Sequence, residues 1–403
     1  MHKRKTIEPI ARIAATNSGE TKCFVFVDEL EKARKALNPF VNTVVSSYPF
    51  IKAFGVHCNI HKLSDLNSLE CVKAVAPHTM VTTLDDVASQ YPCYSSQSFI
   101  DTVNKSSNNL FCSKKISVAV IDTGLCSHLD FMLGKKIVFR DFINNQKLPY
   151  DDNGHGSAVA GILCGSGLSS SGKFCGIASN ANLVALKAIG TKGEGGAFAI
   201  LEAMQWIYDN HERYNIKIVC MSFGAETVVN GIDPLSIGAE SLYKKGIVVV
   251  ASAGNSGPNS HTIKSPGINP KIVTVGGASF ENIKSIDETK DTKLATQQVT
   301  IPHFSSRGPA GKFNKPDIVA PSVNIASINS QTNSYQVFTG TSMAAPIVAG
   351  AAALLLSKKP NLTPSRVKEI LLNSAKRLSY PKTWAGYGLL SFSFLDEIEN
   401  DYE

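Results

Sequence analysis

Three short segments of the chain carry side chains that could work together as nucleophile, base and orienting acid. Asp122 ends the apolar run at 118–121, His155 stands between two glycines, and Ser342 begins an apolar stretch. A serine hydroxyl becomes a nucleophile toward a carbonyl carbon when a histidine takes its proton and an acid orients that histidine. Taken singly, each residue also has a structural interpretation as a helix cap or a buried histidine.

The surroundings of His155 and Ser342 favour chemistry over capping. Gly154 and Gly156 allow another chain to approach the imidazole closely, and the small residues at 157–161 suit a tightly packed helix. Ser342 falls in the first turn of an expected apolar helix, where the helix dipole favours a developing oxyanion. Together the segments predict acyl transfer through a serine.

The chain order Asp122, His155, Ser342 is that of the subtilisin triad. On these segments the sequence resembles the subtilase family from about residue 115 to about residue 390. The resemblance implies a serine endopeptidase, in which Ser342 attacks a peptide carbonyl, His155 transfers the proton and Asp122 holds the imidazole. It also implies that Asn255, in the turn 253–257, donates a hydrogen bond to the oxyanion.

The same resemblance implies a binding site for an extended protein or peptide substrate between two edge strands. The residues of the two edges are Gly193, Glu194 and Gly195 on one side and Ser222, Phe223 and Gly224 on the other. The pocket for the P1 side chain, the residue before the cut bond, would be lined by the stretch 251–254, which includes Ala253 and Gly254, and by the stretch 262–266. Lys264 would favour an acidic P1 residue if it turned inward and would have no effect if it pointed to solvent.

The elements that must position these residues follow from the apolar pattern after residue 115. Apolar runs without alternation indicate strands covered on both faces, and helical patterns separate them, so we expect an α/β fold with a doubly wound parallel sheet. The expected strands are 116–121, 183–188, 216–221, 247–251 and 272–275, and the expected helices are 198–214, 234–244, 341–357 and 364–376.

Residues 22–81 predict a small α+β domain of βαββαβ order, with the last strand at 72–81. It resembles the inhibitory propeptide of subtilases, which implies an intramolecular inhibitor whose tail includes Thr83 and Leu84, and self-cleavage between Thr83 and Gln90. A permanent accessory domain is the alternative. The expected organisation is an N-terminal extension at 1–21, a propeptide-like domain at 22–84, a linker and start of the mature chain at 85–114, and a catalytic domain at 115–403.

Composition excludes several other classes of protein. The net charge of +7 is spread along the chain, which argues against a nucleic-acid partner, and no apolar stretch suggests a membrane span or a leader. We therefore expect a cytoplasmic protein, with secretion without a leader left open. The nine cysteines show no metal-binding spacing and are expected to be reduced.

Two departures from the family pattern bear on cofactors and activity. Ala158 stands where subtilases usually have a second histidine, and Ser157 replaces the common threonine. The loop 165–173 has no carboxylate, so we expect no calcium there, and a weaker calcium site elsewhere is left open. Catalysis itself should need no cofactor.

Two other functions fit the sequence less well. A catalytically silent subtilase fold that binds peptides would be suggested by a damaged triad, and none is seen. An α/β-hydrolase esterase needs the motif G-x-S-x-G and a histidine after the serine. The segment 340–344 lacks that motif, and His155 precedes Ser342.

Overall fold

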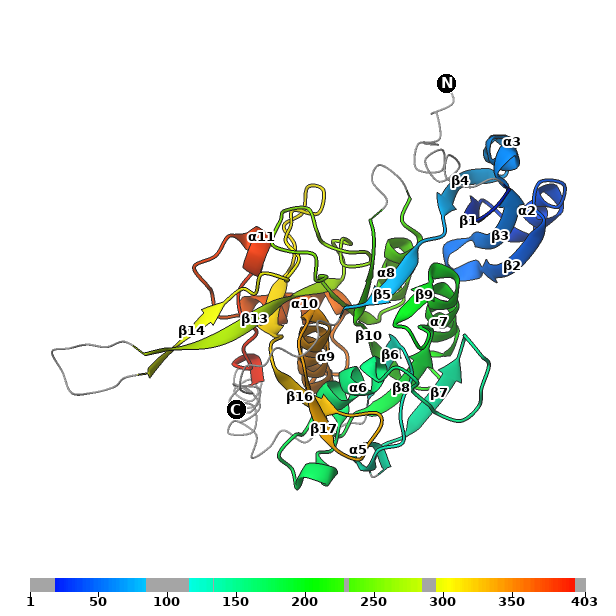
Figure 1. Cartoon of the computed structure of the whole chain (residues 1–403). Coiled ribbons are helices and arrows are strands. Elements are labelled where there is room, and N and C mark those ends of the chain that lie inside the picture. The colour runs from blue at the N-terminus through cyan, green and yellow to red at the C-terminus, as the bar shows by residue number, and fades with distance from the viewer. Residues whose placement is uncertain (1–18, 85–115, 133, 228–231, 285–294, 396–403) are drawn as a thin grey trace.

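The computed structural model describes residues 19–84, 116–132, 134–227, 232–284 and 295–395. A large sheet with helices on both faces forms the body of the molecule, and a smaller sheet with two helices lies beside it (Figure 1).

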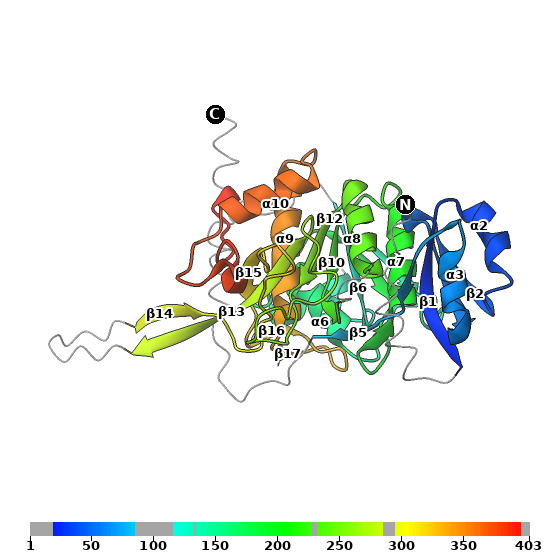
Figure 2. The same ribbon diagram turned by 90° about the horizontal axis from the view of Figure 1, so that it is seen from above.

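The large sheet has eight strands in the order β14-β13-β12-β10-β6-β8-β7, with β15 beside β13. Their bounds are β6 Ser117–Asp122, β7 Ile137–Asp141, β8 Asn182–Lys187, β10 Ile216–Met221, β12 Val248–Ser252, β13 Val273–Lys284, β14 Ala295–Thr300 and β15 Ile318–Pro321. All pairs are parallel except β13 with β14. The prediction of a wholly parallel sheet is therefore wrong at this edge: β13 runs on into an antiparallel hairpin that projects from the body (Figure 2).

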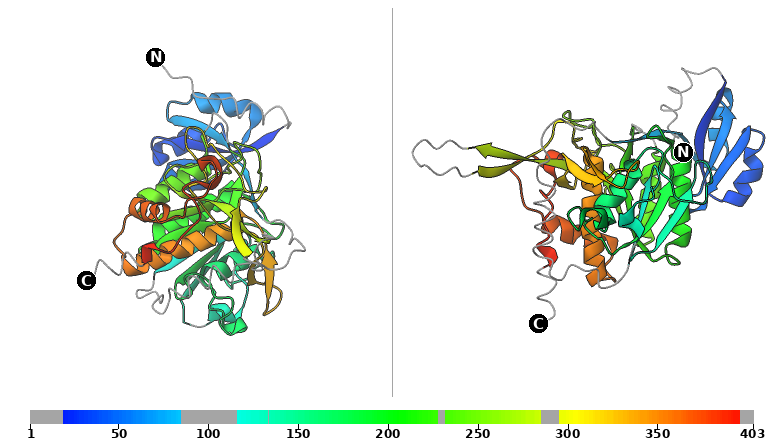
Figure 3. Two further views of the ribbon diagram at one scale, coloured as in Figure 1. Left: turned by 90° about the vertical axis from the view of Figure 1, so that its left-hand side faces the viewer. Right: turned by 60° about the horizontal axis from the view of Figure 1, so that its bottom comes forward.

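Helices cover both faces of the sheet, as Figure 3 shows. They are α6 His155–Cys164, α7 Ala197–Asn210, α8 Pro234–Lys244, α9 Thr341–Lys358 and α10 Pro364–Asn373. Val118 and Val120 belong to the core shared with α6 and α9, while Ala119 and Ile121 belong to the core shared with α7 and α8. Strands buried on both faces need apolar residues at every position, which explains the uninterrupted runs.

The helix α9 is long and apolar enough to cross a membrane, but 94% of its apolar window is buried inside the protein. It runs through the middle of the larger core, in contact with strands of the sheet and with α6. The apolar composition of α9 is therefore explained by its place in the core.

The small domain is a four-stranded antiparallel sheet in the order β2-β3-β1-β4. Its elements are β1 Glu20–Val27, α2 Leu30–Leu37, β2 Thr43–Tyr48, β3 Ala53–Asn59, α3 Leu63–Ser68 and β4 Val72–Pro77. The single strand predicted at 72–81 is wrong. β4 ends at Pro77, which has no N–H for the ladder, and the chain enters a different sheet as β5 Met80–Thr83.

One face of the small sheet is covered by its own helices, and the other packs on α7 and α8. The rings of Phe24 and Phe198 meet edge to face with centroids 4.8 Å apart, and the Tyr48 hydroxyl donates to the Phe198 carbonyl at 3.2 Å. The Phe50 amide donates to Gln205 at 3.0 Å. Apolar and polar contacts together fix the small domain against the body.

The remaining strands form two small sheets. β5 lies between β9 Glu194–Gly196 and β11 Phe223–Ala225, and β16 Ile325–Ile328 pairs with β17 Tyr335–Phe338. Two short helices are α5 Leu129–Met132 and α11 Lys382–Ala385, and the 3-10 turns are η1 Pro49–Ile51, η2 Ile60–Lys62 and η3 Leu168–Ser170.

Candidate active site

Asp122 and His155 face each other at the carboxyl end of the large sheet. Asp122 is the last residue of β6 and His155 is the first residue of α6, and His155 Nδ1 lies 2.6 Å from Asp122 Oδ1. The pair is almost fully buried. Burial raises the pKa of Asp122 above its ordinary value, and the neighbouring His155 ring and Thr123 N–H lower it in part. A proton on Nδ1 satisfies the carboxylate and leaves Nε2 as the basic nitrogen.

A second carboxylate ties the two segments together. Asp151 accepts hydrogen bonds from the Thr123 hydroxyl at 2.8 Å and from the Ser157 N–H and hydroxyl at 2.8 and 2.7 Å. The Thr123 hydroxyl in turn accepts from the Gly156 N–H at 2.8 Å. Asp151 thus satisfies the start of α6 and links it to the residue that follows Asp122.

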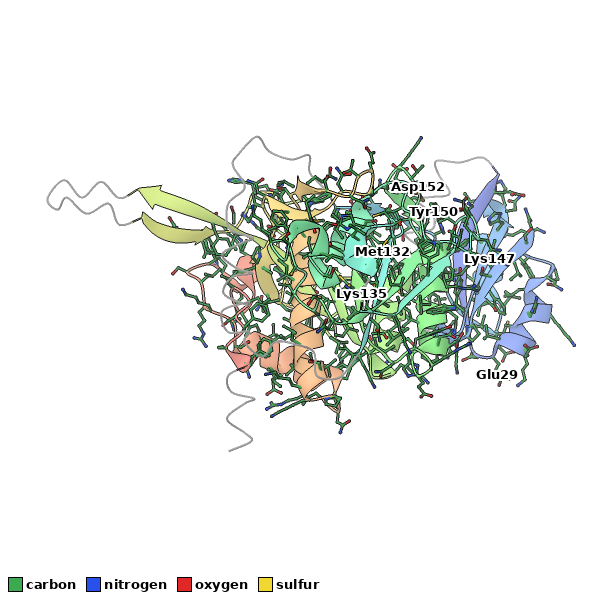
Figure 4. All side chains as sticks on the ribbon, turned by 90° about the horizontal axis from the view of Figure 1, so that it is seen from below. Glu29, Met132, Lys135, Lys147, Tyr150 and Asp152 are labelled. Carbon is green, nitrogen blue, oxygen red and sulfur yellow. The ribbon has the colours of Figure 1, made fainter. Side chains whose placement is uncertain are left out.

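Lys187 is a buried cation at the same end of the sheet. It is opposite Asp122 in the pairing of β6 with β8, and its ammonium donates to the Ile189 carbonyl at 3.1 Å and to Asp152 at 2.6 Å. It also donates to the Thr123 carbonyl at 2.5 Å. Figure 4 labels Tyr150 and Asp152 in the loop before α6, and the Lys187 ammonium lies 4.9 Å from the centre of the Tyr150 ring. Lys187 therefore joins the loop before His155 to the strand end at Asp122.

Ser342 and Asn255 come from different elements and meet at one point. Ser342 is in the first turn of α9, and its hydroxyl donates to the Ser222 carbonyl at 2.9 Å and to the Leu84 carbonyl at 3.1 Å. Asn255 follows β12, and its Nδ2 donates to the same Leu84 carbonyl at 2.7 Å. The Asn255 amide thus holds a main-chain carbonyl oxygen beside the serine hydroxyl, as a side-chain donor of an oxyanion site would.

The carbonyl that occupies this point belongs to the segment leading out of the small domain. β5 pairs antiparallel with β9 and β11, with Val81 opposite Gly195 and Thr82 opposite Gly224. The Thr83 N–H donates to the Gly193 carbonyl at 2.8 Å. The structure thus brings together the six predicted edge residues around residues 80–84, and the chain's own segment forms the middle strand.

Glycine is needed where this segment approaches its neighbours. Gly193 has φ +73°, and a Cβ there would lie 2.5 Å from the Thr83 hydroxyl. Gly340 has φ +150°, and a Cβ there would lie 2.3 Å from the Leu84 carbonyl oxygen. A side chain at Gly340 would push the segment away, because the close atom is a backbone oxygen. At Gly193 the close atom is a side-chain hydroxyl that can rotate aside, and the positive φ is what favours glycine.

The Leu84 side chain lies on the same side of Gly224 as Lys264, one of the residues predicted to line the P1 pocket. Lys264 reaches this region with its carbon stem, while its ammonium pairs with the exposed carboxylate of Glu226. Neither of the two expectations for Lys264 describes this arrangement, because the carbon stem lies near Gly224 and Gly254 while the ammonium pairs with Glu226.

The loop 165–173, where no calcium is expected, donates a hydrogen bond to a neighbouring acid, Asp130. Asp130 is buried, and its carboxylate accepts hydrogen bonds from the Ser169 N–H at 3.0 Å and the Tyr335 hydroxyl at 2.8 Å. Across the described residues, three or more His, Cys, Asp or Glu side chains nowhere gather as a metal site would require.

Asp151 and Lys187 are not among the site residues predicted from the sequence. The pair Asp151-Asp152 just ahead of Gly154 was a signal for capping of the α6 N-terminus, because an acid near the first turn of a helix satisfies its free N–H groups. A lysine at the end of an apolar strand gave no comparable signal. The whole expected linker, residues 85–114, lies outside the described residues, and so do residues 85–90 of the expected cleavage region.

Comparisons with known proteins agree with this geometry. The subtilase family model matches residues 113–389. The chain is 38% identical over 348 residues to the serine protease AprX of Bacillus subtilis, covering 78% of this chain and 76% of that protein. It is 31% identical to subtilisin E of the same species, covering 70% and 65%.

Two further relatives extend over the small domain as well. A thermostable alkaline protease of Halalkalibacterium halodurans is 28% identical and is matched over 93% of this chain and 92% of its own length. The crystal structure of fervidolysin from Fervidobacterium pennivorans, a keratinolytic enzyme related to subtilisin, superposes with a TM-score of 0.70 at 22% identity. That match covers 93% of this chain and 60% of fervidolysin, and at this identity it speaks for the fold. The chain belongs to the subtilase family and is a serine endopeptidase of the subtilisin type.

Proposed function

We propose that the chain is a self-processing zymogen in which Ser342 attacks, His155 moves the proton and Asp122 orients the imidazole. Asn255 and the Ser342 N–H then stabilise the oxyanion of the tetrahedral intermediate. These steps use only groups of the protein, so we propose that catalysis needs no metal or other cofactor.

One observation carries this proposal. The Leu84 carbonyl oxygen accepts hydrogen bonds from Asn255 Nδ2 at 2.7 Å and from the Ser342 hydroxyl at 3.1 Å. A carbonyl held by Asn255 beside the Ser342 hydroxyl is the one that a serine nucleophile would attack, because the Asn255 donor favours the negative charge that develops on the oxygen. We therefore propose that the peptide bond after Leu84 is cut in maturation.

The small domain acts as an intramolecular inhibitor in this proposal. It supplies β5, which lies where an extended substrate would bind between β9 and β11. Its sheet is also held on α7 and α8, and the Ser241 hydroxyl donates to the Phe50 carbonyl at 2.9 Å. Because β5 is held by β9 and β11 and its domain is held on α7 and α8, this segment blocks the site until the chain is cut and the segment leaves.

Intact mass spectrometry tests this function. The full chain should lose residues 1–84 with time and then hydrolyse casein, while the Ser342→Ala variant should keep its full mass and leave casein intact. Mixing active chain with the Ser342→Ala variant separates cleavage within one molecule from cleavage between molecules. If the wild type keeps its full mass and casein stays intact, the zymogen proposal is wrong. A cut elsewhere with active product would reject Leu84 as the P1 residue.

A further inference from the structure

The carbon stem of Lys264 lies near the side chain of Leu84, the residue whose carbonyl is beside Ser342. A Cβ atom built on Gly224 would lie 2.7 Å from Lys264 Cβ and 3.4 Å from Leu84 Cδ1. The Leu84 side chain and the Lys264 stem therefore lie on the same side of the β11 backbone. The Leu84 side chain is itself buried, as expected for a residue held in a pocket.

The stem passes between two glycines that leave room for it. A Cβ on Gly254, which has φ +112°, would lie 2.6 Å from Lys264 Cγ. The Lys264 N–H donates to the Ala253 carbonyl at 2.9 Å, and Ala225 and Ser265 exchange two backbone hydrogen bonds at 3.0 Å. The backbone on both sides of the pocket thus fixes where the stem begins.

The charged end of Lys264 lies at the rim of the pocket. Its ammonium pairs with Glu226. The Lys264 side chain is 14% exposed, whereas that of Glu226 is 84% exposed. Long basic side chains commonly line an apolar surface with their methylene groups while the head group stays polar. The lysine is thus held, and its acidic partner is free to move away into solvent.

We propose that Lys264 and Glu226 together determine the P1 preference of this protease, an inference that rests on the proposed function. The stem occupies space in the pocket, so a side chain of leucine size fits better than an aromatic ring. Glu226 occupies the ammonium, so an acidic P1 side chain meets a competing carboxylate. Removing Glu226 leaves a poorly hydrated cation beside the pocket, which then favours an acidic P1 residue.

Residue 84 of the full chain is the proposed P1 residue, so substitutions of Leu84 test the P1 preference directly. Leu84→Glu and Leu84→Phe should each process more slowly than the wild type when intact mass is followed over time. Adding Glu226→Gln should speed the Leu84→Glu chain about fivefold, the factor that corresponds to about 1 kcal/mol for an ion pair at a surface. Adding Lys264→Met should abolish that gain, and raising the salt concentration should reduce it.

The size of the pocket is tested by shortening the stem. Lys264→Ala should speed the Leu84→Phe chain relative to the Leu84 chain by about tenfold, because it removes the methylene groups that limit the pocket. Glu212→Gln is a matched control, since Glu212 is an exposed acid on the turn after α7 and its removal should change neither ratio. The role of Glu226 is overturned if the processing rate of the Leu84→Glu chain relative to the Leu84 chain is the same with and without Glu226. The role of Lys264 is overturned if the processing rate of the Leu84→Phe chain relative to the Leu84 chain is unaffected by Lys264→Ala.

A binding measurement keeps this inference separate from the proposed function. In the Ser342→Ala background no cleavage is expected, and the thermal unfolding midpoint reports how well residue 84 fits its pocket. Leu84→Glu should lower the midpoint, and Glu226→Gln should restore part of the loss only while Lys264 is present. If no chain processes but this pattern appears, the pocket assignment stands and the self-processing proposal fails. If the chains process but neither the processing rates nor the unfolding midpoints depend on Lys264 and Glu226, the pocket assignment fails and the self-processing proposal stands.

Discussion

Thr341 holds the side-chain amide of Asn255 in one orientation. Asn255 Oδ1 accepts from the Thr341 N–H at 3.0 Å and from the Thr341 hydroxyl at 2.9 Å. Because the oxygen of the amide is occupied, its NH₂ group must face the other way, toward the Leu84 carbonyl. The residue that precedes Ser342 therefore aims the donor that the oxyanion would use.

Removing this donor should slow the chemical step. We expect Asn255→Ala to lower kcat by about 10²–10³ with little change in KM, a range established on subtilisin itself. Thr341→Val removes one of the two bonds that orient the amide and should lower kcat by about tenfold. Steady-state kinetics on a peptide with leucine at P1 measures both. A lower affinity with kcat preserved would mean that Asn255 binds substrate and does not stabilise the transition state.

Lys187→Met should lower the stability of the protein. The substitution keeps most of the volume but leaves Asp152 and the carbonyls of Thr123 and Ile189 without their shared donor. Breaking a buried network of this kind costs about 2–4 kcal/mol of unfolding free energy. Denaturant unfolding in the Ser342→Ala background measures the loss without self-digestion. The comparison Lys217→Met, on a partly exposed position of β10, should leave the unfolding free energy within about 0.5 kcal/mol of its parent.

Gly340→Ala should prevent self-cleavage while the protein still folds. The new methyl would meet the Leu84 carbonyl oxygen at 2.3 Å and Asn255 Nδ2 at 2.9 Å. Gly246→Ala is the matched control, because Gly246 also has positive φ, +92°, but no atom lies within 4 Å of a Cβ there. Both variants carry backbone strain of about 1 kcal/mol, and only Gly340→Ala blocks the oxyanion site. Equal processing of the two variants would contradict the assignment of that site.

Acid should weaken the docking of the small domain through His78. Burial, helped by the nearby Lys22 and His57, lowers the pKa of His78 to about 4. Its ring packs edge to face on Phe198 with centroids 4.4 Å apart. An unfolded or undocked histidine takes up a proton near pH 6.5. The docked state therefore loses stability as the pH falls from about 6.5 through about 4.

The size of this effect is limited because His78 is only partly buried. We expect about 1 kcal/mol after allowance for solvent screening. Proteolytic susceptibility of the small domain in the Ser342→Ala chain, measured between pH 7 and pH 4, should rise in acid. His78→Phe should remove most of that rise. A pH profile that is the same for both chains would exclude His78 as its source.

Much of the fold could be predicted because the core leaves a strong pattern. The helix predicted at 234–244 matches α8, and the strand predicted at 216–221 matches β10, since both are bounded by clear polar or proline signals. The helix predicted to run to Tyr214 ends at Asn210, because the following turn has polar residues that suit no buried face. β14 was not predicted, because its residues Thr296 to Gln298 give no apolar run and the strand depends on pairing with β13.

The candidate site was predictable where motifs are local and not where it depends on long-range contact. Asp122, His155, Ser342 and Asn255 each lie in a short segment with characteristic neighbours, and the structure brings all four segments to one end of the sheet. The pairing of Lys264 with Glu226 joins residues from different loops. The position of Leu84 depends on β5 leaving the small sheet after Pro77, which the apolar pattern of 72–81 does not indicate.

The placement of β5 between β9 and β11 also sets how any other peptide can enter the site. A segment tethered to its own binding groove has an effective concentration in the millimolar range. A free substrate at micromolar concentration would be outcompeted by this segment roughly a thousandfold at equal intrinsic affinity. In the proposed maturation, cutting the chain after Leu84 would turn this advantage into ordinary competition between separate molecules, so dilution alone should then release the groove.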